Sequence, residues 1–205
     1  MRTLVIETST TACSVALIEA GAVIARTHDV VGRGHAERLI PMIADLPDGG
    51  RADRILVDCG PGSFTGVRVG IAAARGLALG WGAEIAGFSS LPLIAAAAFS
   101  ERPTHDIAVV MEGGHGEVFM QAFSADLSPR TDMVSLRPDA ALAALAGRRA
   151  VGNGIRWLAA LDPMLDLTEA LPDAAAAILL PDSLTALPPS PIYGRAPDAK
   201  PSVPK

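Results

Sequence analysis

The stretch GPGSFTGVRVG, residues 60–70, combines glycines and hydroxyl side chains with a following alanine-rich run, as a phosphate-binding loop before a helix would. A P-loop needs the lysine of G-x-x-x-x-G-K-[ST], and none occurs from the loop to the end of that run. A dinucleotide-binding G-x-G-x-x-G would need glycine where Thr65 stands. Two interpretations stay open: a general anion contact through Gly62, Ser63 and Thr65, or a plain helix-capping turn.

An acidic residue ends the first apolar run in each half of the chain. Glu7 precedes the hydroxyl-rich turn TSTT, and Glu112 precedes the turn GGHG. With Ser9 beside it, Glu7 could hold a magnesium–phosphate group, although an ordinary strand-end acid explains it equally well. The hypothesis from the enzyme class is therefore a stand-alone actin-like ATPase or small-molecule kinase that uses Glu7, Ser9 and the turn at residues 62–65.

Other catalytic patterns are missing from the sequence. The four histidines form neither HxxxH nor HExxH and do not pair with cysteine at zinc-like spacing, and no G-x-S-x-G elbow occurs. Cys13 and Cys59 lie far apart and read as buried free thiols. We therefore expect no catalytic residue, no metal site, and neither ATPase nor peptidase activity from this chain alone.

The net negative charge of the chain argues that it does not bind nucleic acid directly. The formal net charge is -5, and Lys and Arg form no cluster that could grip a phosphate backbone. Only 19% of the residues are charged, which suggests that a partner covers some apolar surface. The sequence opens without an apolar leader and has no charge-free run of membrane-spanning length, so we expect a soluble, cytoplasmic protein with no membrane contact.

The order of apolar runs predicts two similar halves. Residues 4–30 are predicted to form a three-stranded meander, followed by a helix over 32–46 and a strand over 54–60. A long helix from about Thr65, a strand over 84–89 and a helix over 91–100 come next. A second meander over 107–136 precedes helical stretches near 138–146, 154–161 and 172–180 and a short strand at 149–151. This layout favours the duplicated ribonuclease-H-like, or actin-like ATPase (ASKHA), α/β fold with two lobes, and a single irregular α/β domain is the alternative.

The domain division follows from the same layout. The predicted lobes are residues 1–102 and 103–187, followed by a proline-rich tail over 188–205 that cannot join a sheet interior or a helix. We expect this tail to be extended, with packing at Ile192 and Tyr193.

The long helix over 65–81 has no polar side, since its only charges are Arg68 and Arg75. A helix that covers one domain is normally apolar on one side only. One apolar stripe can face the helix's own sheet, while a second stripe, which includes Gly70 and Ala73, would lie in water. We expect that second stripe to form an intermolecular surface with the helix over 32–46, and enclosure within its own lobe is the alternative.

Several segments resemble, in order, the TsaB family, whose members are bacterial partner proteins in the synthesis of threonylcarbamoyladenosine in tRNA. The segments are MRTLVIETSTTACSVAL, GRGHAERLIPMI, GPGSFTGVRVGIAAARGLA, GFSSLPLIA, GEVF and PIYGRAPDAKP. The resemblance covers the first 124 residues and the tail. It implies an actin-like fold that has no catalysis of its own and pairs with the related catalytic subunit TsaD.

The resemblance also implies that this chain lacks the metal-binding pair of the catalytic relative. TsaD holds a metal with an HxxxH pair, and the matching stretch SSLPLI places Ser90 and Ile94 at those positions. Because Ile94 offers no donor atom, this pair cannot bind a divalent metal. The chain also departs from the family's pattern, with Glu7 for the usual Asp and with Glu112 and Gly114 in place of D-x-R, which weakens any nucleotide site in its own cleft.

The resemblance implies the following partners: a TsaD-like subunit, a TsaE-like ATPase, and a second copy of the chain when it is alone. It implies no cofactor bound by this chain itself, with an adenine nucleotide, if any, at the junction with the catalytic subunit. On this basis Ala73→Glu or Gly70→Leu should block docking and leave the chain folded. The expected interface residues are His35, Arg38, Leu39, Met42, Gly66, Arg68, Val69, Gly70, Ala73 and Leu77.

Overall fold

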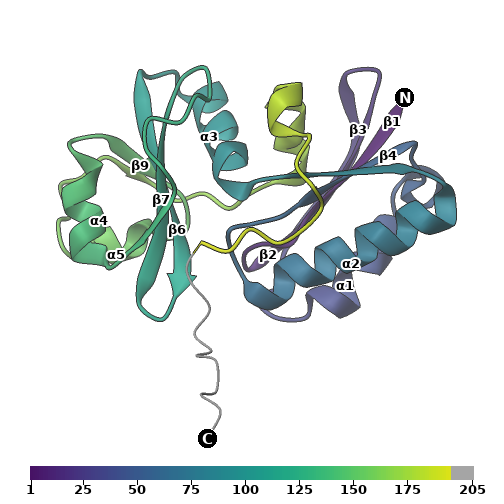
Figure 1. The fold of residues 1–205 in the computed structure, drawn as a ribbon, viewed down its shortest axis with the longest axis horizontal. Helices are drawn as coiled ribbons and strands as arrows, with labels where there is room; N and C mark the ends of the chain where they lie inside the picture. The colour runs from purple at the N-terminus through teal and green to yellow at the C-terminus, as the bar shows by residue number, and fades with distance from the viewer. Residues whose placement is uncertain (195–205) are drawn as a thin grey trace, which may run out of the picture.

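The computed structural model describes residues 1–194, in which two mixed five-stranded sheets lie side by side (Figure 1). The first sheet contains β1 (Arg2–Glu7), β2 (Ala12–Glu19), β3 (Ala22–Val30), β4 (Arg54–Asp58) and β5 (Glu84–Phe88). The second contains β6 (Asp106–Gly114), β7 (Glu117–Ser124), β8 (Val134–Leu136), β9 (Arg149–Val151) and β10 (Leu167–Thr168). Predictions for the tail beyond residue 194 lie outside the described residues.

The two sheets have the same topology. The first has the order β3-β2-β1-β4-β5, and the second, read from β8, has β8-β7-β6-β9-β10. In each, the first three strands form an antiparallel meander, and the next two add in parallel to its first strand. This repeated order confirms the predicted duplicated, ribonuclease-H-like fold with two lobes.

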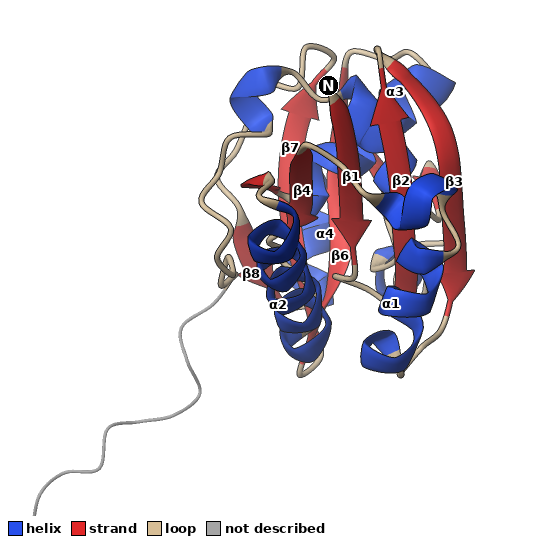
Figure 2. Ribbon diagram, turned by 90° about the vertical axis from the view of Figure 1, so that its right-hand side faces the viewer, coloured by secondary structure: helices blue, strands red, loops and turns tan. Residues whose placement is uncertain are grey.

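Helices precede or follow the parallel strands and connect them to the rest of each sheet. They are α1 (His35–Ala44), α2 (Phe64–Trp81), α3 (Ser90–Glu101), α4 (Pro138–Leu145) and α5 (Ile155–Ala159), with 3-10 turns η1 (Pro47–Gly50), η2 (Ala174–Leu179) and η3 (Asp182–Leu184). Figure 2 shows α1 and α2 together on one face of the first sheet. Among residues 1–194, no helix has both the length and the apolar character needed to span a lipid bilayer.

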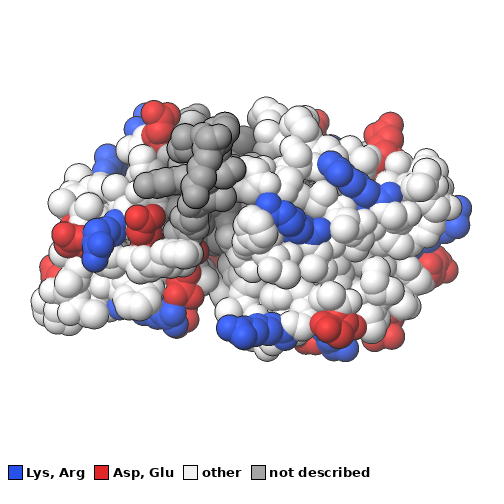
Figure 3. Space-filling view, turned by 60° about the horizontal axis from the view of Figure 1, so that its bottom comes forward, with Lys and Arg blue, Asp and Glu red and all other residues white. Residues whose placement is uncertain are grey.

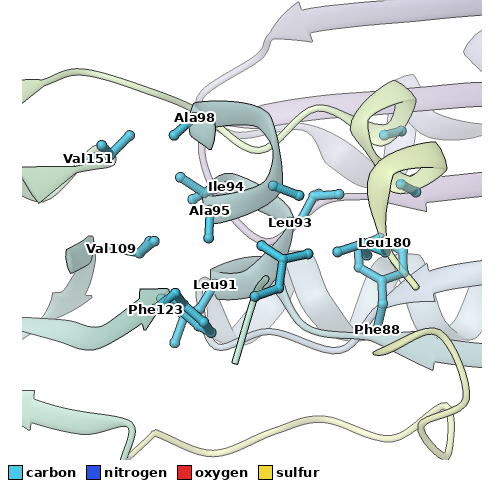
Figure 4. Close-up of a cluster of buried hydrophobic side chains, with 14 of the residues drawn as sticks. Phe88, Leu91, Leu93, Ile94, Ala95, Ala98, Val109, Phe123, Val151 and Leu180 are labelled. Atoms are coloured by element: carbon cyan, nitrogen blue, oxygen red, sulfur yellow. The ribbon is translucent and has the colours of Figure 1, made fainter. Parts of the chain in front are cut away.

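Three apolar clusters hold these layers together. One lies under α1 and α2, one under α4 and α5, and the third surrounds α3 between the sheets. Figure 4 shows this third cluster, with Phe88 of the first lobe on one side of α3 and Val109 and Val151 of the second lobe on the other. Because the core around α3 draws side chains from both sheets, the two lobes share one continuous interior.

The segment over 172–180 differs from the predicted helix. It forms the 3-10 turn η2, which begins where Asp173 Oδ1 accepts a hydrogen bond from the amide of Ala175 (2.8 Å). Pro172 and Pro181 flank the turn, and proline at these positions disfavours a longer α-helix. The turn packs on β2, β3 and α3, beside the first lobe. The division into residues 1–102, 103–187 and 188–205 stays a prediction.

The chain after η3 runs back along the first lobe. Leu187 pairs with Gly87 of β5, and the amide of Ile192 donates to the carbonyl of Cys59 (2.7 Å). The Tyr193 hydroxyl accepts a hydrogen bond from Arg68 Nη2 (2.8 Å). This segment is extended and is held at the two residues expected from the sequence.

Candidate docking surface and its supporting loop

Two acidic side chains lie together beneath the loop at residues 60–63. Glu7 ends β1 and Asp58 ends β4, and these parallel strands pair with Ile6 opposite Val57, so both carboxyl groups reach the same edge of the sheet. Both residues are fully buried. Ser9 donates through its amide and its hydroxyl to Glu7 Oε1, and the amide of Gly60 donates to Asp58 Oδ1.

Burial raises the pKa of both carboxyl groups, and the like charge of Asp58 adds to the rise at Glu7. Burial is the main cause that raises the pKa of Glu7 well above its ordinary value, and the neighbouring Asp58 raises it further. Burial also raises the pKa of Asp58 to about 7. Within the described residues, the second oxygens, Glu7 Oε2 and Asp58 Oδ2, have no hydrogen-bond partner. Two unpaired carboxylate oxygens in a dry environment favour a state in which the pair retains at least one proton.

The loop above this pair is closed. The amide of Ser63 donates to the carbonyl of Ser9 (2.6 Å), and a Cβ at Gly62 would collide with that same carbonyl. The Ser63 hydroxyl accepts from the amide of Gly66 (3.2 Å) and so caps α2. Thr65 lies exposed in the first turn of α2.

The five residues predicted to contact an anion are thus neighbours, but their polar groups do not converge on open space. Glu7 and Ser9 are enclosed, and Ser63 is occupied as a cap. Within the described part of the chain, His, Cys, Asp and Glu side chains form no group of three that could hold a metal ion. The geometry is that of the helix-capping turn, and the enclosed pair does not fit a magnesium–nucleotide group.

The second acidic position, Glu112, lies near the end of β6. It is half-buried, and Trp157 Nε1 donates to its Oε1 (3.3 Å). Arg156 forms an ion pair with the same oxygen. The two acids therefore occupy corresponding strands of the two lobes in quite different environments, one dry and one solvent-accessible.

One apolar stripe of helix α2 faces the core of its own lobe. Val67, Ile71, Ala74 and Ala78 are buried over the first sheet. Gly66 and Gly70 are buried too, because they meet Thr8: its hydroxyl donates to the Gly66 carbonyl (2.8 Å), and a Cβ at Gly70 would collide with that hydroxyl. These two glycines serve the chain's own packing. The expectation that Gly70→Leu leaves the chain folded is therefore corrected.

Helix α1 is likewise turned differently from the prediction. His35, Leu39 and Met42 are buried, and His35 Nε2 lies 2.9 Å from the carbonyl oxygen of Ala12 in β2. These three side chains pack onto β2 and are not available to a partner on the outer face. An apolar stripe with helical spacing looks the same in sequence whether it faces a core or a partner.

The remaining predicted interface residues are accessible. Arg38 is exposed and pairs with Asp29 (Nε to Oδ2, 2.8 Å), and the guanidinium of Arg68 stacks on the exposed Phe64 ring (3.3 Å to the ring centre). Val69, Ala73 and Leu77 are half-buried in α2, each touching the core on one side and solvent on the other. Their role at an interface stays a prediction.

Together these observations define an exposed apolar surface, which we call the α1–α2 face. It consists of Ile40 and Ala44 of α1 and Val69, Ala72, Ala73, Gly76, Leu77, Leu79 and Gly80 of α2. Leu79 is 88% exposed and Ile40 is 48% exposed. Figure 3 shows the first lobe from below, where uncharged residues predominate and charged ones are scattered.

Six members of this face were not among the predicted interface residues: Ile40, Ala44, Ala72, Gly76, Leu79 and Gly80. The sequence signal for the α2 members was present, since they continue the small and apolar character of that helix around its outer side. Asp58 was also missed. It could have been found as the acid that ends the strand parallel to the one ending in Glu7.

Comparison with known proteins identifies relatives of this arrangement. A family model described as TsaD: tRNA N6-adenosine threonylcarbamoyltransferase matches residues 27–134, about half of the 205 residues. The tRNA threonylcarbamoyladenosine biosynthesis protein TsaB of Escherichia coli K12 is 37% identical over 131 residues, which cover 62% of this chain and 56% of that protein. The TsaB protein of Haemophilus influenzae is 37% identical over 123 residues, covering 57% and 51%. The matched region thus spans about half the length of these curated relatives.

Solved structures match over almost the whole length. YeaZ from Pseudomonas aeruginosa has a TM-score of 0.77 at 28% identity and covers 94% of this chain and 99% of its own. A second structure from that organism, described as similar to the peptidase YeaZ, has a TM-score of 0.78 at 28% identity, covering 95% and 99%. The similarity therefore extends over both lobes.

Proposed function

We propose that this chain, which belongs to the family described by the TsaD model, is a TsaB-like, non-catalytic subunit of the machinery that forms threonylcarbamoyladenosine in tRNA. Its proposed role is to dock a TsaD-like catalytic subunit and to stabilise the active arrangement of that subunit. Relatives named for this biosynthesis support the pathway.

The observation that carries the docking role is the α1–α2 face. Contiguous exposed apolar surface on a water-soluble domain usually marks an interaction site. Ala72, Ala73, Gly76 and Gly80 have small side chains, so another helix can approach α2 at the short end of the usual separation of about 8–10 Å. A TsaD-like subunit with a related fold is the proposed partner, and a second copy of the chain is the proposed partner when it is alone.

The enclosed polar groups support the non-catalytic part of the proposal. Glu7 and Ser9 lie beneath a closed loop, where a phosphate group cannot reach them. Ser90 is buried, with its hydroxyl 3.0 Å from Asp58 Oδ1, and Ile94 packs in the core around α3. The chain would then leave tRNA contact, nucleotide hydrolysis and metal chemistry to its partners. One of these partners would be a TsaE-like ATPase, and an adenine nucleotide would bind at the junction with the catalytic subunit.

Co-purification with an affinity-tagged TsaD-like subunit tests the docking role. Ala73→Glu places a charge on the α1–α2 face, where burial of an unpaired carboxylate is costly, and we expect at least a tenfold loss of co-purified chain. Gly76→Leu should act through bulk, since a Cβ at Gly76 meets no atom within 4 Å in the free chain. The matched control is Ala143→Glu on the exposed side of α4, which should bind like wild type.

If Ala73→Glu and Gly76→Leu co-purify with the TsaD-like subunit at wild-type yield, the α1–α2 face is not the docking surface.

The stand-alone ATPase or kinase hypothesis has a separate test. Calorimetry of the isolated chain with Mg-ATP should give no heat of binding if the closed loop persists in solution, whereas tight binding with hydrolysis would favour the enzyme.

A further inference from the structure

A groove lies between the lobes, away from the loop at residues 60–63. It has a volume of about 1020 Å³ and is bounded by β3, α3, β9 and the segment at residues 168–179. None of Glu7, Ser9, Gly62, Ser63 and Thr65 lines it. The groove is therefore separate from the predicted anion site and from the α1–α2 face.

Arg149 of β9 lines this groove with an incompletely paired guanidinium. Its side chain is only 7% exposed. Its Nε and Nη2 both donate to one acceptor, the Thr168 hydroxyl (3.3 and 3.0 Å). Its Nη1 is buried and has no hydrogen-bond partner among the described residues.

The nearest carboxylate does not neutralise Arg149 closely. Asp166 Oδ1 lies 3.9 Å from Arg149 Nε, and both oxygens of Asp166 lie 3.1 Å from the guanidinium of Arg102. A buried guanidinium that shares a distant carboxylate with another arginine retains much of its desolvation cost. An anion beside it would reduce that cost.

A second unpaired nitrogen lines the same groove from the other lobe. His28 Nδ1 of β3 is buried without a hydrogen-bond partner in the described part of the chain, and it lies 3.9 Å from Asp173 Oδ2. Asp173 Oδ1 is already occupied, because the Ala175 amide and the Ser14 hydroxyl donate to it. Two of the four unpaired buried polar atoms in residues 1–194 thus border one groove, on opposite lobes.

The groove also has an apolar wall and an acidic rim. Ile94, Ala98 and Val151 provide the wall, and Figure 4 shows these α3 residues on the side toward Val151. Glu101 and Glu169 are exposed at the rim, which Arg26 also lines, and they disfavour a ligand with several anionic groups. A ligand with one anionic group on a short apolar body matches this combination.

We propose that the groove binds a small molecule that carries one carboxylate or phosphate group, held by the Arg149 guanidinium, on a short apolar body that lies against α3. Carboxylate and phosphate groups accept paired hydrogen bonds from guanidinium, which a lone hydroxyl acceptor such as Thr168 cannot replace. His28 would hydrogen-bond a second polar group of the ligand from the other lobe. This site is independent of the docking role.

Thermal unfolding with simple anions tests the proposal. The chain is heated in sodium chloride, sodium phosphate or sodium butyrate at equal ionic strength, and the same series is run on Arg149→Met and on Arg149→Lys. Arg130→Met, which removes an exposed arginine from another part of the second lobe, is the matched control. Phosphate also stabilises proteins without binding them, so the informative quantity is the shift of wild type minus that of Arg149→Met.

Site binding predicts that phosphate or butyrate, at ten times its dissociation constant, raises the Tm of wild type and of Arg130→Met by about 3–6 °C more than that of Arg149→Met. Arg149→Lys should retain only part of the shift, because lysine cannot form the paired hydrogen bonds. A larger shift with butyrate than with phosphate would indicate a carboxylate ligand, and the reverse a phosphate ester. Equal shifts in wild type and Arg149→Met for both anions would overturn the proposal, and so would no shift at all.

Discussion

At the scale of single residues, the buried pair Glu7 and Asp58 is the most strongly perturbed feature of the molecule. Two like-charged groups in a dry site interact far more strongly than they would in water. The pair also touches the loop that seats α2, because Ser9 contacts both Glu7 and, through its carbonyl, Ser63. Protonation of the pair and the seating of α2 are therefore linked.

This pair predicts that stability falls as the pH rises. The folded pKa values of both carboxyls lie above their unfolded values, so the folded state binds more protons than the unfolded state between about pH 4 and the folded pKa of Asp58, about 7. The stability associated with the pair is fully present below pH 4 and is lost across that window. We expect the free energy of unfolding in urea to fall by on the order of 2 kcal/mol from this pair between pH 5 and 8.

Glu7→Gln tests the cause of that fall. The amide removes the like charge beside Asp58, so the variant should be more stable than wild type at pH 8 by roughly 1–3 kcal/mol and should show a flatter pH dependence. The matched control is Glu84→Gln at an exposed position, which should keep the wild-type slope. A Glu7→Gln profile parallel to that of wild type would refute the charge interaction.

At the scale of elements, α2 has two kinds of glycine. Gly70 lies against Thr8, whereas a side chain at Gly76 would enter open space. Gly70→Ala should therefore destabilise the chain by roughly 1–3 kcal/mol through overpacking, although alanine is the better helix former. Gly76→Ala should stabilise it by about 0.5–1 kcal/mol, as expected for an exposed position inside a helix.

Urea unfolding of the two variants checks this contrast in one helix. The double variant Thr8→Ala, Gly70→Ala should recover part of the loss, because it removes the hydroxyl group with which a Cβ at residue 70 would collide. If Gly70→Ala proves as stable as Gly76→Ala, the close seating of α2 on the turn after β1 is not present in solution.

The elements also show what sequence could predict. The central strands β1, β4 and β6 could be predicted as short apolar runs, because they are buried on both faces. The long helices could be predicted from apolar spacing near 3.6 residues. The orientation of α1 did not, and Leu39 and Met42 were assigned to a partner although they pack on β2. The two-residue strand β10 was missed because it is too short to show a period. Arg149 and His28 line the same groove although 121 positions separate them in the sequence, so their proximity could not be predicted without the structure.

At the scale of the whole molecule, the two lobes share one topology but differ in their surfaces and contacts. The first lobe carries the α1–α2 face, and the second lobe closes a shared core around α3. The loop that resembles a phosphate site supports helix α2, through the Ser63 cap and the contact of Thr8 with Gly66. The central claim is that this outer face of the first lobe is covered by a partner.

Thiol labelling can measure that coverage directly, because both native cysteines are buried and burial raises the pKa of each thiol to about 11. A cysteine introduced by Ala72→Cys should react quickly with a maleimide in the dilute free chain and at least tenfold more slowly in the presence of a TsaD-like subunit. Ala143→Cys on α4 should react at the same rate with and without the partner. The same rate at residue 72 in bound and free chain, measured where the complex is formed, would contradict the account.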